Sequence, residues 1–186
     1  ERSVLLTLLL INGVMFVAEF VVGIIADSTG LLADSLDMLA DATVYGIALY
    51  AVGRAEATKN TAARCSGYFQ IALALGVFLD ILRRLAFGSE PQSSLMLGAG
   101  FVALIANVIC LVILSKHRKG GIHMRASWIF SKNDVIANLG VMLAALGIYL
   151  TGSRWPDLVI GLVITLIVLR GGLSILREAK GDVAAR

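Results

Sequence analysis

The sequence predicts an all-α integral membrane protein, a bundle of six transmembrane helices with both termini in the cytoplasm. Three observations carry this prediction. Of the 186 residues, 58% are hydrophobic and only 16% are charged, which is outside the range of soluble domains. The charges cluster between long apolar runs, each close to the roughly 20 residues that a spanning helix needs. The basic residues gather in alternate loops, as they do in membrane proteins of fixed orientation.

Six apolar runs divide the chain into expected spans joined by short connections. Together they make one transmembrane domain that occupies residues 1–186. In chain order, the expected spans are Val4–Ala26, Leu31–Gly53, Ala63–Phe87, Leu95–Ser115, Ser127–Leu150 and Trp155–Leu176.

Positive charge sets the expected orientation. It gathers after the second and fourth spans, whereas the connections on the opposite side are nearly free of cations. By the positive-inside rule both termini are cytoplasmic, and this requires an even number of spans. The net charge of +3 therefore reports topology, and we expect the lipid bilayer as a partner rather than nucleic acid. The cations of these two loops are Arg54, Lys59, Arg64, Lys116, Arg118, Lys119 and Arg125.

Four carboxylates fall inside the second and fifth expected spans, where lipid would surround an unprotected side chain. Asp34, Asp37 and Asp41 lie in the second span, and Asp134 lies in the fifth with Asn138 one turn further on. One such charge at the centre of a spanning helix costs about 2.5–3.5 kcal/mol on insertion scales. Apolar packing alone gives no reason to place three of them in one helix.

Helical spacing places these carboxylates on two stripes. Residues three and four apart share a face, so the three aspartates of the second span form one stripe, which must face the bundle interior or a water-filled cavity. A single aspartate could instead pair with a basic residue such as Lys132 or Arg170. Asp37, Asp41 and Asp134 together favour a site for a divalent metal ion or for protons, because hard oxygen ligands at this density suit divalent cations.

The segment Gly30–Asp41 resembles the second-helix signature of the cation diffusion facilitators, a family of zinc-transporter-like exporters. That signature places a His or Asp four residues before an Asp, and Asp37 and Asp41 stand at those positions. In the fifth span, the segment Ala126–Asp134 resembles the other half-site of the family, and the match continues at Asn138. The first span carries Asn12 and Glu19 in a similar pattern, so the resemblance covers the whole chain.

The sequence departs from the family pattern in two respects. Phe130 stands where the fifth helix usually offers a metal-binding His or Asp, so the usual set of four ligands is short by one. Asn138, Asn133 or a water could supply the missing oxygen; Asn138 shares the face of Asp134, whereas Asn133 is rotated by about 100°. The family's cytoplasmic metal-binding domain is not in the sequence shown.

The resemblance implies a secondary active transporter in the cell membrane, of the kind found in bacterial inner membranes, and not an enzyme. It would export zinc, and also cadmium, from the cytoplasm in exchange for protons, with the metal as cargo rather than as a resident cofactor. A broad or manganese-, iron- or cobalt-selective exporter is the alternative within the same fold. The resemblance also implies a homodimer. From other classes, the alternatives are a membrane-embedded aspartate-dependent enzyme and a non-transporting scaffold.

Overall fold

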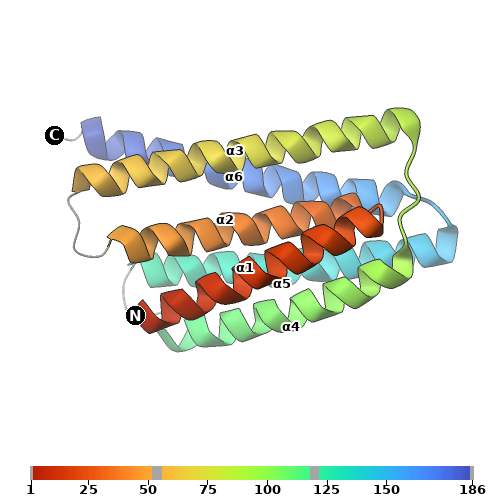
Figure 1. Cartoon of the computed structure of the whole chain (residues 1–186), viewed down its shortest axis with the longest axis horizontal. Coiled ribbons are helices and arrows are strands. Elements are labelled where there is room, and N and C mark those ends of the chain that lie inside the picture. The colour runs from red at the N-terminus through yellow and green to blue at the C-terminus, as the bar shows by residue number, and fades with distance from the viewer. Residues whose placement is uncertain (1, 52–55, 118–121, 185–186) are drawn as a thin grey trace.

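A computed structural model shows six long helices that run side by side (Figure 1). It describes the backbone of residues 2–51, 56–117 and 122–184, and the side chains of residues 2–50, 61–116 and 131–177. Both termini lie at the same end of the bundle, as an even number of spans requires. The helices are α1 (Arg2–Ile25), α2 (Thr29–Ala51), α3 (Glu56–Phe87), α4 (Ser93–His117), α5 (Ile122–Thr151) and α6 (Trp155–Ala184).

The predicted six-helix membrane bundle is confirmed, but the most apolar stretch of one helix, α2, is less apolar than those of the others. Five helices within the described residues are long and apolar enough to cross a membrane, and α2 is not among them. Its 23 residues reach about 35 Å, which is long enough to span a bilayer. However, every 18-residue stretch of α2 contains all three aspartates, so no such stretch is free of several charges. Helices α3, α5 and α6 extend several residues beyond the predicted spans, because polar turns at the bilayer surface remain helical.

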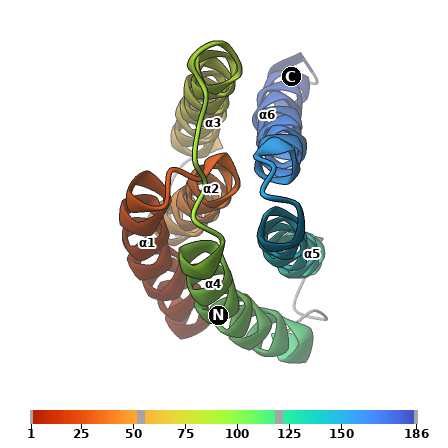
Figure 2. The same ribbon diagram turned by 90° about the vertical axis from the view of Figure 1, so that its right-hand side faces the viewer.

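The composition of α2 is explained by its place in the bundle. It lies in the middle and contacts each of the other five helices (Figure 2). From residue 28 to residue 36, every side chain except that of Leu32 is buried. A helix that is covered on all sides has no face that must be apolar for lipid. The other helices present their large apolar side chains outward, so they shield α2 from the bilayer.

Close approach of α6 to its neighbours depends on positions without side chains. A Cβ atom on Gly161 would lie 2.7 Å from Thr29 Cγ2 and 3.1 Å from the Thr29 carbonyl carbon at the start of α2. Further along α6, Gly172 packs directly on the backbone of Gly67 in α3. Small residues at helix crossings are a common means of tight packing in membranes. The two glycines of α6 therefore bring it against both α2 and α3.

Replacing Gly161 with Ala is expected to destabilise the bundle by about 1–3 kcal/mol, because the added methyl would overlap Thr29. Thermal unfolding in detergent measures this as a lower midpoint. Gly98→Ala on α4 is the matched control, since a Cβ atom there meets nothing within 4 Å. Equal midpoints for the two variants would contradict the close contact between α2 and α6.

Candidate metal centre

Three aspartates from two helices meet near the middle of the bundle. Asp37 and Asp41 lie one turn apart on α2, and Asp134 projects from α5. All three are half-buried, and the carboxylates of Asp37 and Asp41 each lie close enough to interact with that of Asp134. The structure thus brings together the three carboxylates that the sequence predicted as ligands. Lys132 and Arg170, the basic residues considered as partners, are exposed and form no ion pair with them.

Two uncharged side chains border the same carboxylates. The Tyr45 hydroxyl, on α2, donates a hydrogen bond of 3.3 Å to Asp41 Oδ2. The thiol of Cys110, on α4, lies within the electrostatic reach of Asp41 and Asp134. Asn12 on α1 donates from Nδ2 to Cys110 Sγ at 3.8 Å. Four helices therefore contribute to the surroundings of this cluster.

The expected fourth ligand has two candidates on the face of α5 that carries Asp134. Asn138 is fully buried; its Nδ2 donates to the Asp134 carbonyl oxygen at 3.0 Å, while Oδ1 has no hydrogen-bond partner. Ser131, three residues before Asp134, is also buried, and its hydroxyl has no partner among the residues that the structure describes. Asn133 is exposed, so the structure does not bring it to the cluster. The side chain of Phe130 lies outside the described residues.

The carboxylates are neighbours but are not gathered as ligands of one ion. Among the described side chains, no three from His, Cys, Asp and Glu converge in a metal-binding arrangement. Like charges at this separation repel one another unless protons or a cation lie between them.

A second pair of carboxyl groups lies next to this cluster. Glu19 on α1 and Asp34 on α2 are each 1% exposed and lie within interaction range of each other. The two carboxyl groups lie close enough to share a hydrogen bond, and apart from each other neither Glu19 nor Asp34 Oδ2 has a partner in the described part of the chain. An ionised carboxylate without a partner is expensive to bury. The pair therefore links α1 to α2 next to the cluster.

The start of α2 is capped by a carboxylate from another helix. Asp157, near the beginning of α6, is fully buried and accepts hydrogen bonds from Ser28 Oγ at 2.6 Å, Thr29 N at 2.7 Å and Gly30 N at 2.9 Å. Ser28 Oγ in turn accepts from Leu31 N at 3.1 Å. These bonds satisfy amides that a helix start leaves without partners, and the negative charge suits the helix dipole.

A buried arginine holds the same end of the bundle. Arg84, at the end of α3, donates to Asp80 on its own helix and to both the carbonyl and the carboxylate of Asp27 in the α1–α2 turn. Asp80 forms ion pairs with both Arg83 and Arg84 on its own helix. Asp27 Oδ2 further accepts from Glu90 N at 2.8 Å. This network ties the α1–α2 turn to α3 and to the α3–α4 connection.

These features define a multi-pass protein of the cell membrane with an acidic site at mid-bundle. Residues 5–182 match the family described as the cation efflux transmembrane domain. The chain is 30% identical to the metal cation efflux system protein CzcD of Cupriavidus metallidurans, over 98% of this chain and 63% of that protein. It is 23% identical to a cadmium, cobalt and zinc/H(+)-K(+) antiporter of Bacillus subtilis, over 96% of this chain and 62% of that protein.

The chain belongs to the cation efflux family, the cation diffusion facilitators. A further relative, the zinc transporter ZitB of Yersinia pseudotuberculosis, is 29% identical over 58% of this chain and 36% of its own length. The chain spans less than two thirds of the length of these relatives. All three names describe transport, in agreement with the expectation that the chain is not an enzyme.

Sequence reasoning missed the contributions of Asp157, Cys110 and Ser131. Asp157 and Cys110 contact helices that are distant in the chain, so no local residue spacing predicts their contacts. Ser131 does share a face with Asp134 at a spacing of three residues, and that spacing could have found it.

Replacing Asp157 with Asn is expected to destabilise the bundle by about 2–3 kcal/mol, because the cap loses its charge and one acceptor oxygen. Thermal unfolding in detergent is the measurement. Glu90→Gln, an exposed carboxylate at the same end, is the control and should leave the midpoint unchanged. If both variants unfolded at the wild-type temperature, the cap would contribute nothing to stability.

Proposed function

We propose that this chain exports divalent metal ions from the cytoplasm in exchange for protons, with zinc as the first choice of cargo and cadmium also carried. The observation that supports this proposal most is the meeting of Asp37, Asp41 and Asp134 from two helices at mid-bundle. Nothing in the packing of an apolar bundle requires three carboxylates at one depth. The names of two relatives, a metal cation efflux protein and a cadmium, cobalt and zinc antiporter, agree with metal efflux.

The cargo ion would be held by carboxylate oxygens from both helices. Asp37 and Asp41 offer a pair from α2, and Asp134 offers the third from α5. We assign the fourth oxygen to Asn138 Oδ1, because it is buried, unpartnered and one turn from Asp134. Ser131 is the second candidate for that position, and the exposed Asn133 is the third. Oxygen ligands of this kind accept zinc and also admit other divalent ions.

Protons are the natural exchange partners of such a site. Three ionised carboxylates in a low dielectric repel one another, and either a divalent cation or protons relieve that repulsion. A metal that binds therefore displaces protons, and protons that arrive later release the metal. Lower pH must weaken metal binding, since the protonated carboxyl groups no longer serve as ligands.

The described contacts favour access to the site from the cytoplasmic end. The Asp157 cap and the Arg84 network hold α1, α2, α3 and α6 together at the opposite end. Release to the outside would require these bonds to loosen while the cytoplasmic end closes. A two-state movement of this kind provides alternating access without any covalent step.

Cys110 supports the choice of zinc and cadmium over manganese. The Cys110 thiol lies next to Asp41 and Asp134, and a metal ion that displaced its proton would gain a soft ligand in an otherwise hard oxygen site. Soft ligands favour zinc and cadmium, whereas carboxylates and water suit manganese and magnesium.

Asp41→Asn and Asp134→Asn are each expected to reduce zinc flux into proteoliposomes by more than about 100-fold. Loss of a residue that only hydrogen-bonds a metal ligand already costs roughly 10–100-fold, and these substitutions remove a ligand itself. Each substitution removes a charged ligand while it keeps the size of the side chain. Glu90→Gln serves as the control, because Glu90 is an exposed carboxylate far from the cluster in sequence and at the end of the bundle. Undiminished flux in a folded Asp134→Asn protein would refute the proposed site.

Cys110→Ser is expected to weaken cadmium binding by about tenfold while it leaves manganese binding nearly unchanged, because only the soft ion gains from the thiol. Competition between the two ions for the purified protein measures this selectivity. Cys65→Ser is the matched control, since Cys65 is exposed. A parallel loss of both ions would show that Cys110 only supports the packing around the site.

We also propose that the protein is a homodimer, as the family resemblance implies. Cross-linking in lipid bilayers tests this assembly, and a purely monomeric protein under those conditions would exclude it.

A further inference from the structure

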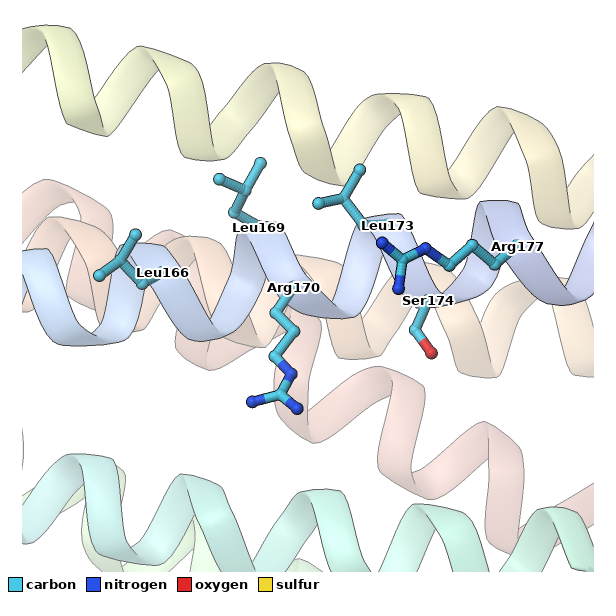
Figure 3. A pocket seen from close by; sticks show the side chains of 6 residues that line it. All are labelled: Leu166, Leu169, Arg170, Leu173, Ser174 and Arg177. Carbon is cyan, nitrogen blue, oxygen red and sulfur yellow. The ribbon is translucent and has the colours of Figure 1, made fainter.

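A cavity of about 380 Å³ lies along α6 between Leu166 and Arg177 (Figure 3). Its volume is more than ten times the roughly 30 Å³ that one water molecule occupies in the liquid. Three leucines line one part, and two arginines with a serine line the other. The lining residues are Leu166, Leu169, Arg170, Leu173, Ser174 and Arg177.

Arg170 is an unusual residue for its position. It lies about 22 Å along α6 from Trp155, well inside the apolar part of the helix. A charged side chain at such a depth normally pairs with another group or reaches toward the membrane surface. Arg170 is exposed, and no ion pair of the described residues includes it. It is also absent from the charges that act on Asp37, Asp41 and Asp134, so it does not balance the acidic cluster.

Arg177 adds a second positive charge to the same side of α6. Residues 170, 174 and 177 share one helical face, because they are four and three positions apart. Figure 3 shows the side chain of Arg177 folded back along the helix toward Arg170, so that its guanidinium group lies over Ser174. Both arginines thus line one cavity together with the three leucines.

We propose that this groove binds an anionic phospholipid of the cytoplasmic leaflet, with the headgroup phosphate between Arg170 and Arg177 and an acyl chain along the leucines. Charge complementarity selects this occupant. Guanidinium groups bind phosphate in a bidentate manner, and basic pockets at the cytoplasmic side of membrane proteins suit anionic headgroups. The end of α6 that carries Arg177 is the end at which both chain termini lie.

A second copy of the chain fits this groove less well. A symmetric contact would bring the same patch of both copies into one interface, and the positive charges of four arginines would then add there. An anionic lipid instead neutralises both charges and fills the apolar part of the cavity. The same lipid would link α6 to the bilayer at the end of the bundle opposite the Asp157 cap.

Native mass spectrometry of the purified full chain with phosphatidylglycerol or phosphatidylcholine tests this site. We expect the wild type to retain phosphatidylglycerol in preference to phosphatidylcholine. Arg170→Gln combined with Arg177→Gln should weaken phosphatidylglycerol binding by about 30-fold, at roughly fivefold for each charge near an anionic headgroup. Arg64→Gln is the matched control, because Arg64 is an exposed arginine at the same end of the bundle but outside the cavity.

Lysine substitutions separate charge from packing. Arg170→Lys with Arg177→Lys should keep most of the preference for phosphatidylglycerol, because both positive charges remain. Equal retention of the two lipids by the wild type, or unchanged phosphatidylglycerol binding in the double Gln variant, would overturn the proposal. So would a double Gln variant that changes only the proportion of dimer, because a second copy of the chain would then be the occupant.

Discussion

The constraint on which the structure depends is that the three aspartates of α2 must be kept away from lipid. Each would cost a few kcal/mol in the hydrocarbon core, so α2 can cross the membrane only if other helices surround it. The bundle meets this requirement by placing α2 in the middle, in contact with all five neighbours. The strongly apolar helices around it provide the lipid-facing surface, and α2 in turn presents its polar stripe to α5 and α1.

Precise placement of α2 follows from polar contacts at one end of the bundle. Asp157 caps its first turn from α6, while Arg84 holds the preceding turn through Asp27. These bonds reach only the first residues of α2, and the aspartates lie beyond the anchored turn.

Much of this arrangement could be predicted from the sequence, and the reasons are physical. The cost of charge in a membrane and the helical period identify Asp37, Asp41 and Asp134 without any knowledge of the fold. The same reasoning could not find Asp157, because its partners lie more than a hundred residues away in the chain. Nor could it separate Asn133 from Asn138 with certainty; the buried, unpartnered Oδ1 of Asn138 became visible only when α5 was placed against its neighbours. The position of Cys110 likewise depends on how α4 packs.

The central claim is that the aspartate cluster exchanges a divalent metal for protons. Calorimetric titration of the purified protein with zinc, in buffers of different ionisation enthalpy and at several pH values, tests this claim most directly. We predict that zinc binding releases protons, and that the apparent affinity falls by about tenfold per pH unit for each proton displaced as the pH is lowered. Zinc binding without proton release, at an affinity that does not depend on pH, would contradict it.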